Sequence, residues 1–551
     1  MKSKIVKLLT FALFNVLPVI LVMLAVVMHF SRGNFYMVHV DPEYFHLFNG
    51  LNLAIFNLAI DFIHHPGTSI QVIYALSAPV VNLTMPGGDL ITNAMKDPET
   101  FIHGANVLLN LLTAASLVAL GWYAYRKSGN LMLSLLLQMM PFASFHVVAI
   151  TGRLIPETAM IAPLLLLCLT TVIYIHDEES SLHQQKYVFA FAIIGGLGMS
   201  AKFLYFPFLV APLFMIPAFR MKARYILYTM AATVIFAFPV FVHLGKSVSW
   251  FGNMFLHSGK WGAGQATVLD PRGFSQALQE MYRIDPGFFV LLVLLILSIL
   301  LGLGMIIYKP RPSLNRLPAA ALGIAVSVTI SILVIGKHFA AHYYFPTLLT
   351  KFFILYLIAL LIIRVIDVKY VTFLISLAAL AAGMVFSLQQ VAPLAANAES
   401  LREKALIFEN RQQVLNQYDT RHHPLIITSH YRGSVFRQSA MVGGFLMSGP
   451  LKSTFREELL KQYPDTYFYY DWTDMFYNWD LFKPASAFAE PDEPVYVFIG
   501  EGKEMNLTPI IERLNSAIPG YRAEAVLLEQ FHNPTESFYE VRFRKENKEN
   551  E

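Results

Sequence analysis

The stretch "MKSKIVKLLTFALFNVLPVILVMLAVVMHF", residues 1–30, decides the class of fold. Its start is basic, as in a signal peptide, but its apolar run reaches the length of about 20 residues that crosses a bilayer. No small-residue cleavage site follows, so we interpret it as a retained membrane anchor. The whole chain agrees, because 56% of its 551 residues are hydrophobic and 14% are charged, whereas about 25% of an ordinary globular domain is charged. The chain is an integral membrane protein, and its net charge of +4 does not indicate a nucleic-acid partner.

Hydropathy predicts eleven membrane-spanning helices, with the N-terminus in the cytoplasm and the C-terminus outside. The predicted spans are 5–30, 101–123, 131–150, 159–176, 187–201, 203–219, 225–244, 287–307, 318–336, 345–363 and 370–389. Basic residues favour the cytoplasmic side, and they occur before the fifth span at Lys186 and after the sixth at Arg220. Both ends of this pair therefore lie inside, which requires a hairpin with Lys202 at its outer turn.

With this topology, carboxylates, cations and imidazoles from separate loops gather on the outer face. They are Asp41, Glu43, Asp61, His64 and His65 in the first loop (31–100), Arg153 and Glu157 in "TGRLIPE", Lys202, Lys260 in "HSGKWGAGQ", and Lys337, His338 and His342 in "GKHFAAHYYFP". Outer loops also carry polar residues for solubility, which is the simpler explanation of any single position. As a set, the residues indicate a site, because charge at the lipid boundary is costly unless it is paired or functional.

The first loop is itself structured. Apolar residues recur with helical period through "PEYFHLFNGLNLAIFNLAIDF" (42–62), which predicts a helix lying in the membrane interface. "HHPG" (64–67) ends this helix, and a second amphipathic stretch, "TSIQVIYALSAPVVNL" (68–83), follows it. Asp41 therefore sits at the start of a helix on the outer face.

The order of these features resembles the GT-C superfamily of membrane glycosyltransferases. The features are a first span, an acidic pair directly after it, a loop with horizontal helices, further spans and an outer C-terminal domain. The resemblance covers residues 1 to about 390. "DPE" (41–43) resembles the family's first-loop acidic motif, and "RLIPE" (153–157) resembles its second-loop acidic element. The family includes the protein O-mannosyltransferases and the aminoarabinose transferases of lipid A, and this chain resembles a bacterial branch of it. The acidic motif is neither "DE" nor "DxD", so a divalent cation (Mg²⁺ or Mn²⁺) stays an open possibility, and we assign no metal ligand.

The resemblance implies transfer of a sugar from a polyprenyl-phosphate-linked donor to a lipid, glycan or protein acceptor, with inversion at the anomeric carbon. The acceptor hydroxyl needs a base, for which we choose Asp41, with Glu43 or Glu157 as support or alternate. The leaving phosphate needs cationic stabilisation. Candidates for it are Arg153, Lys202, Lys337, His338, His342 and Lys260, and His65 is a candidate contact to the acceptor or sugar.

Two features of the outer loops allow a second interpretation each. His64 and His65 could bind a metal with Asp41, although adjacent histidines do not easily reach one ion. "GKWGAG" (259–264) could cradle a phosphate, but no strand–loop–helix context surrounds it, so a flexible loop is the better interpretation.

After residue 390 the composition changes to that of a small α/β domain, residues 391–551. Strands are predicted at 424–429, 494–500, 523–530 and 538–545, with helices at 434–447, 453–462 and 507–517 between them. The aromatic run "YPDTYFYYDWTDMFYNWD" (463–480) either stacks sugars, with Trp472 and Trp479 leading, or forms an edge of the core.

We therefore expect a transmembrane domain at 1–390 and an extracytoplasmic (periplasmic) domain at 391–551, in the inner membrane of a bacterium and in contact with its lipids. The alternative function is a transporter or flippase of a lipid-linked glycan. Its relevant features are Lys351, the exceptional charge inside a span, which we expect to snorkel outward, and the proline-broken sixth span. Transport pathways place ionisable groups near the bilayer midplane, whereas these carboxylates lie outside, which favours the enzyme.

Overall fold

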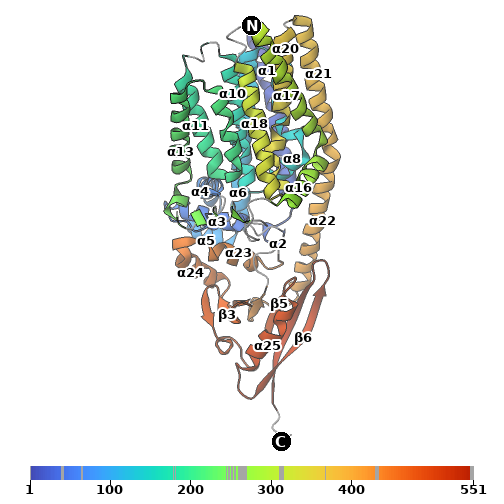
Figure 1. The fold of residues 1–551 in the computed structure, drawn as a ribbon. Helices are drawn as coiled ribbons and strands as arrows, with labels where there is room; N and C mark the ends of the chain where they lie inside the picture. The colour runs from blue at the N-terminus through green and yellow to red at the C-terminus, as the bar shows by residue number, and fades with distance from the viewer. Residues whose placement is uncertain are drawn as a thin grey trace. The chain divides into compact units, whose positions relative to one another are not determined.

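The computed structural model describes residues 2–38, 42–63, 66–177, 179, 182–243, 245, 248–249, 252, 256–257, 270–308, 316–366, 368–428 and 434–546. In this part of the chain, 7 helices are long and apolar enough to cross a membrane by length and composition. They are Leu9–Phe30, Pro98–Ser128, Pro156–His176, Pro286–Gly304, Arg316–Lys337, Phe345–Ile366 and Lys369–Leu415. A sheet domain forms the C-terminal region (Figure 1). The predicted fold class is confirmed, and the count of eleven spans is not.

The helices outside the first loop and the C-terminal sheet domain have the following bounds. They are α1 (Lys2–Phe30), α6 (Pro98–Ser128), α7 (Leu131–Gln138), α8 (Phe145–Ile150), α9 (Pro156–Ala159), α10 (Ile161–His176), α11 (Gln184–Ala201), α12 (Ala211–Met215), α13 (Phe219–Phe236), α14 (Phe238–Val242), α16 (Pro271–Ile284), α17 (Pro286–Tyr308), α18 (Arg316–Lys337), α19 (Phe345–Leu349), α20 (Lys351–Ile366), α21 (Lys369–Gln389) and α22 (Val391–Leu415). Short 3-10 turns are η1 (Met140–Ala143), η2 (Phe203–Leu209) and η5 (Ala341–Tyr343).

Two of the predicted spans are broken into short pieces. Where one helix was predicted at 131–150, α7, η1 and α8 follow one another, with Pro141 at the start of η1 and Ser144 in extended conformation between η1 and α8. Where one was predicted at 203–219, η2 contains Pro207 and α12 ends at Met215. Proline lacks the N–H that a continuous helix needs, so hydropathy alone overestimates the length of these helices.

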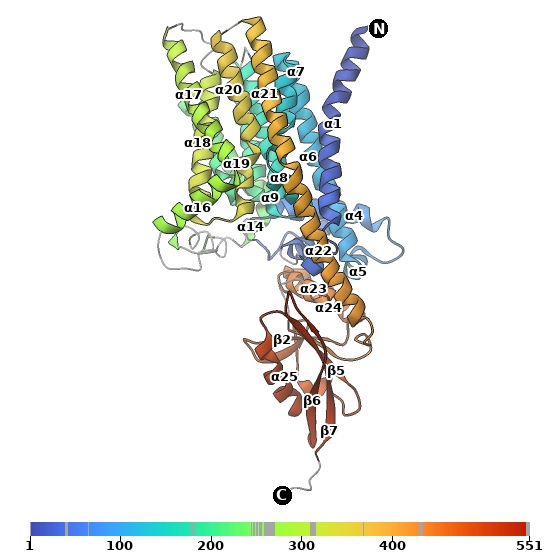
Figure 2. The same cartoon turned by 90° about the vertical axis from the view of Figure 1, so that its right-hand side faces the viewer.

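The chain divides into two compact units, and the first consists of Met1–His29, Ile63–Ile73 and Asn106–Ala398. In this unit α11 lies along α13 (Figure 1), and α17 lies along α18 and α20 (Figures 1 and 2). Gly196 permits the approach of α11 to α13, since a Cβ atom there would lie 2.5 Å from the Cβ of Ala232. Small residues allow such close packing where the hydrophobic effect between helices is weak.

The second unit consists of Phe30–Phe62, Tyr74–Ala105 and Glu399–Glu551, and its centre is a seven-stranded sheet. The strand order is β4-β3-β2-β1-β5-β7-β6, parallel in β2-β1-β5 and antiparallel elsewhere. The strands are β1 (Leu425–Ile427), β2 (Thr466–Tyr470), β3 (Met475–Asn478), β4 (Leu481–Lys483), β5 (Val495–Ile499), β6 (Tyr521–Phe531) and β7 (Glu536–Lys545). The accompanying helices are α23 (Arg437–Leu446), α24 (Lys452–Gln462) and α25 (Leu507–Asn515), and Ile510 and Leu514 of α25 belong to the core against the sheet.

Most of the first loop belongs to this second unit. Its helices are α2 (Phe35–Val38), α3 (Glu43–Ala54), α4 (Thr68–Asn82) and α5 (Leu90–Lys96). Residues 43–52 of α3 are all buried, and a Cβ atom on Gly444 of α23 would lie 2.7 Å from the Tyr44 carbonyl oxygen. The side-chain amides of Asn49 and Asn52 donate to the carbonyl oxygens of Met447 and Ser448 at 2.8 and 2.6 Å, which satisfies groups at the end of α23. The loop helix is thus covered by protein of the C-terminal region.

Candidate active site

Segments that are distant in sequence bring a carboxylate, an ammonium and an imidazole together in the first unit. The Lys202 ammonium forms an ion pair with the Glu157 carboxylate, and the two side chains are 9% and 4% exposed. His342 Nε2 lies 3.7 Å from the same Glu157 oxygen, and its side chain is half exposed. The ring centroid of Tyr343 lies 4.3 Å from Lys202 Nζ, a cation–π distance. We call Glu157, Lys202, His342 and Tyr343 the Glu157 cluster.

The backbone around Lys202 explains how this side chain is placed. Helix α11 ends at Ala201, and Lys202 is extended, with φ −158° and ψ 142°. Lys202 pairs in an antiparallel bridge with Pro66, and the Gly67 N–H donates to the Ala201 carbonyl at 3.1 Å. Gly67 has a φ of +71°, a conformation that glycine adopts without strain. The end of the "HHPG" segment of the first loop therefore adjoins the Lys202 turn, where the predicted hairpin turns.

The segment that carries Glu157 is held from two sides. The imidazole Nδ1 of His29, at the end of α1, lies 2.9 Å from the Gly152 carbonyl oxygen. A Cβ atom on Gly152 would lie 2.7 Å from the backbone nitrogen of His29, so a larger residue does not fit there. The Asn106 amide of α6 donates to the Thr151 carbonyl at 3.1 Å. Because these contacts fix the turn before α9, Glu157 enters the cluster from a rigid support.

The other predicted cations of the outer loops lie near these residues in sequence. Arg153 is half-buried, and its N–H donates to the Ile150 carbonyl at 2.9 Å. Lys337 ends α18, and His338 follows with its N–H donating to Ile335 at 3.1 Å. Both are half-buried, a few residues before His342 in the same loop. Their role toward a donor phosphate stays a prediction.

Three predicted site residues, Asp41, His65 and Lys260, lie outside the described residues. Glu43 is described and belongs to the second unit, where it begins α3 and is fully buried. The Tyr74 hydroxyl donates to the backbone carbonyl of Glu43 at 3.3 Å. Because Glu43 is buried at the start of α3, its position is suited to stabilising the fold of the first loop.

The two tryptophans of the aromatic run lie in different environments of the second unit. Trp479 is fully buried, with its ring edge-on to Phe445 at a centroid distance of 5.8 Å. Trp472 is 62% exposed and stacks on Tyr470 at 4.6 Å. The run forms β2 and β3 with the hairpin between them, which sequence analysis did not predict. Of the two rings, only that of Trp472 is accessible to a sugar.

A second buried ion pair in the first unit was not predicted. Lys351 Nζ lies 2.7 Å from a carboxylate oxygen of Asp285, and both residues are buried. Asp285 also accepts from the Phe288 N–H at 2.9 Å, so it caps the start of α17. The expectation that Lys351 snorkels outward is wrong, because its charge is compensated inside the protein. The "DPG" sequence (285–287), an acidic cap before proline, was the signal that pointed to this partner.

No three His, Cys, Asp or Glu side chains of the described residues gather as a metal site. Asp41, His64 and His65, for which metal binding was considered, lie outside the described residues. In the Glu157 cluster the carboxylate is already engaged by Lys202. The described chemistry of the site is therefore that of a carboxylate-supported cation, which suits an anionic ligand group.

Comparison with known proteins gives structural similarity without sequence similarity. No protein-family model matches the chain, and no curated protein sequence matches it significantly. The structure is similar to ArnT from Cupriavidus metallidurans bound to undecaprenyl phosphate, at 10% identity and a TM-score of 0.49, over 95% of this chain and 97% of that one. It is also similar to the Archaeoglobus fulgidus oligosaccharyltransferase tethered with an acceptor peptide, at 10% identity and a TM-score of 0.42, over 93% and 72% of the two chains.

Proposed function

We propose that this chain is an inverting glycosyltransferase that moves a sugar from a polyprenyl-phosphate-linked donor to a lipid, glycan or protein acceptor at the outer face of the membrane. The observation that carries the proposal is the Glu157 cluster. It holds a lysine ammonium and an accessible imidazole beside the first-loop segment. The distribution of basic residues in the sequence predicts that this turn lies outside.

The reaction follows from these groups. The acceptor hydroxyl attacks the anomeric carbon while the bond to the phosphate oxygen breaks, and attack from the opposite side inverts the configuration. Lys202, His342 and Lys337 stabilise the negative charge on the leaving lipid phosphate. Asp41, which lies outside the described residues, takes the proton of the acceptor hydroxyl. Glu157 holds the Lys202 ammonium in place, since its own charge is already compensated by that ammonium.

The proposed cellular arrangement is a bacterial inner membrane with the N-terminus in the cytoplasm. Basic residues at the predicted inner connections support this orientation. In it the domain at 391–551 is periplasmic, and the first loop is on the same side. Reporter fusions after Lys127, Lys186 and Arg316 should report the cytoplasm, and a fusion after residue 395 should report the outside. A cytoplasmic C-terminus would contradict the proposal.

The test is an assay of the purified protein in lipid nanodiscs. Supplied with a labelled polyprenyl-phosphate sugar and a bacterial envelope extract as acceptor source, the protein should release free polyprenyl phosphate only when the extract is present. Intact donor in every condition would contradict the proposal. A parallel reaction with EDTA tests for Mg²⁺ or Mn²⁺ dependence.

The alternative, a flippase for a lipid-linked glycan, is favoured by the buried Asp285–Lys351 pair inside the helical unit. Ionisable residues in membrane-spanning segments mark transport pathways in many transporters. Here Asp285 also caps α17, so the pair has a structural role that explains its burial. Liposomes separate the two functions, because a flippase moves the donor between leaflets with its glycosidic bond intact.

A further inference from the structure

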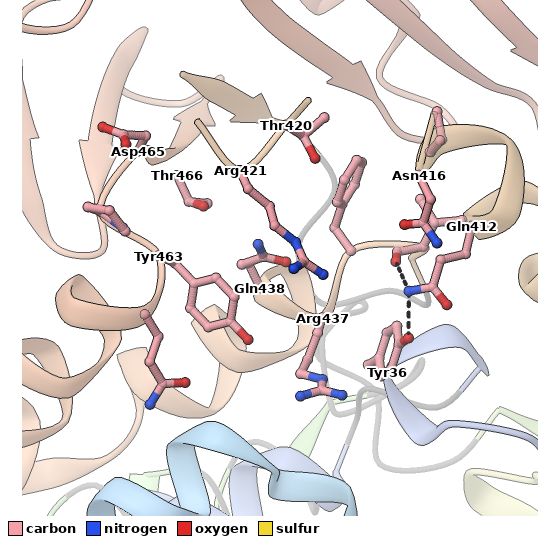
Figure 3. A pocket seen from close by; sticks show the side chains of 15 residues that line it. Tyr36, Gln412, Asn416, Thr420, Arg421, Arg437, Gln438, Tyr463, Asp465 and Thr466 are labelled. Carbon is pink, nitrogen blue, oxygen red and sulfur yellow. Dashed lines mark hydrogen bonds between the residues drawn. The ribbon is translucent and has the colours of Figure 1, made fainter. Parts of the chain in front are cut away.

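A polar pocket of about 450 Å³ lies within the second unit, apart from the residues of the Glu157 cluster (Figure 3). Its walls come from the first loop (Tyr36), α22 and the segment after it (Gln412 to Arg421), the start of α23 and the segment before β2. The volume lies within the usual range of small-molecule sites, about 300–1,000 Å³. The pocket can therefore hold a ligand of the size of one or two sugars.

The wall at Tyr36 is fixed before any ligand arrives. The carboxylate of Glu99, at the start of α6, accepts from the backbone N–H groups of Phe35 and Tyr36 at 3.0 and 3.1 Å, and from the Tyr44 hydroxyl at 2.7 Å. The Gln412 amide donates to the Tyr36 hydroxyl at 2.9 Å, as Figure 3 shows. A preformed wall lowers the ordering cost of binding.

Two arginine side chains line the pocket and make it positively charged. The Arg437 guanidinium donates to the Lys96 carbonyl at 3.1 Å and lies 5.6 Å from the centre of the Tyr36 ring. Figure 3 shows the Arg421 side chain extending into the pocket toward Gln438. In the described part of the chain, Arg421 donates no hydrogen bond and has no carboxylate within ion-pair distance. Its planar donors are thus available to an oxyanion.

The remaining polar groups suit hydroxyls. The Tyr463 phenol is protonated at neutral pH, and burial raises its pKa further above the ordinary value. Gln438 and Asn416 offer amide groups, and the Asp465 carboxylate lines another part of the wall. Two arginines against one aspartate leave the pocket positive, with acceptors and donors for a polyhydroxylated ligand.

We infer that this pocket binds an oxyanion-bearing sugar, a phosphate ester or a uronate, as part of the acceptor. The inference deepens the proposed function, since it names the chemistry of the acceptor. Tyr36, the first-loop residue that lines the pocket, lies five positions before Asp41 in the chain.

The test measures binding of glucose 1-phosphate, glucuronate and glucose to the full-length protein by calorimetry. The two anions, or one of them, should bind, and neutral glucose should bind at least about tenfold more weakly. Arg421→Gln should lower the affinity for the anion by about 10- to 100-fold, which is the usual contribution of a hydrogen bond to a charged group. Arg421→Lys keeps the charge and should recover part of the affinity, and Arg522→Gln, an exposed arginine of β6 outside the pocket, should bind as the wild type does.

Nanodiscs of phosphatidylglycerol and of phosphatidylcholine distinguish a lipid headgroup from a soluble sugar as the source of the anion. If phosphatidylglycerol competes with glucose 1-phosphate, phosphatidylcholine does not, and Arg421→Gln abolishes the competition, the source of the anion is a lipid-borne phosphate. This result supports the inference. Equal affinity for glucose and the anions, or unchanged affinity in Arg421→Gln, overturns it. If the anions bind but the protein never cleaves the donor, the proposed function is contradicted and the assignment of the pocket stands. If the protein cleaves the donor but binds no anion, only the assignment of the pocket is contradicted.

Discussion

The Lys202 ammonium and the Glu157 carboxylate form an ion pair that is almost completely enclosed, with side chains 9% and 4% exposed. Removing one partner of such a pair is costly, because it leaves an uncompensated charge in the interior. The half-exposed His342 lies 3.7 Å from the same carboxylate. The charges of Lys202 and Glu157 therefore compensate one another, and the half-exposed His342 is the member of the cluster most accessible to a ligand.

The pair makes a prediction about stability. Glu157→Gln should lower the free energy of unfolding by about 3–5 kcal/mol, since it leaves Lys202 buried without its carboxylate. The double variant Glu157→Gln/Lys202→Met should recover most of that loss, because both charges are gone. Thermal unfolding in detergent measures the two. A double variant no more stable than Glu157→Gln would argue against this pairing.

Lys337→Met should weaken donor binding and slow turnover together, since it removes a cation from the half-buried end of α18 while keeping the apolar stem. Its effect on stability should stay within about 0.5 kcal/mol. The matched control is Lys369→Met, an exposed lysine at the start of α21 that we predict to be cytoplasmic. If donor affinity and rate are unchanged in Lys337→Met, other groups stabilise the leaving phosphate, and Lys260 is the next candidate.

Asp41→Asn should reduce turnover by about 10²–10⁴-fold, since an amide cannot accept the proton of the acceptor hydroxyl. Donor binding and expression should persist. Glu43→Gln is the neighbouring comparison, since Glu43 is buried at the start of α3. A nearly normal rate in Asp41→Asn would transfer the role of base to Glu43 or Glu157.

Replacement of each of the two tryptophans of the aromatic run by alanine should affect stability differently. Trp479→Ala should destabilise the protein by about 3–5 kcal/mol, the usual cost of removing a buried large aromatic side chain. Trp472→Ala should leave stability nearly unchanged, because its ring is 62% exposed. If Trp472 stacks on the acceptor, its removal raises the KM for the acceptor. Equal stability losses in the two variants would contradict their different burial.

Removal of the chain after residue 395 takes away α23, against which α3 packs. We expect the truncated protein to bind the lipid donor through its helical unit and to lose transfer to the acceptor. Limited proteolysis should cut the first loop within 43–62, where Phe48 and Asn52 lose their partners. Normal transfer by the truncated protein would show that the domain is an appendage.

Much of the fold follows from local patterns in the sequence. The spans around α6, α10, α17, α18 and α20 are long apolar runs with charged ends, and the strands β1, β5, β6 and β7 carry the expected apolar residues. The broken segments at 131–150 and 203–219 were missed because hydropathy does not register the proline and serine that interrupt the hydrogen bonds. Strands β2 and β3 were missed because their residues are aromatic on both faces.

Charge placement in the sequence predicts Glu157, Lys202 and His342 to be outer-face residues, and the structure brings these three side chains together. Their contact was not predicted, because it depends on how three loops fold together. The same limit applies to Asp285 and Lys351, which are 66 positions apart. The pocket around Arg421 joins the first loop to the C-terminal region, and no local pattern indicates such a site.

The most direct test follows cleavage of a labelled polyprenyl-phosphate sugar by wild-type protein and by the Asp41→Asn and Glu157→Gln/Lys202→Met variants in nanodiscs with an acceptor extract. The account predicts that the wild type releases free polyprenyl phosphate and forms a product of inverted anomeric configuration. Both variants should cleave the donor far more slowly, although their thermal unfolding transitions show that they are folded. Equal cleavage by all three proteins, or a wild type that leaves the glycosidic bond unbroken, would contradict it.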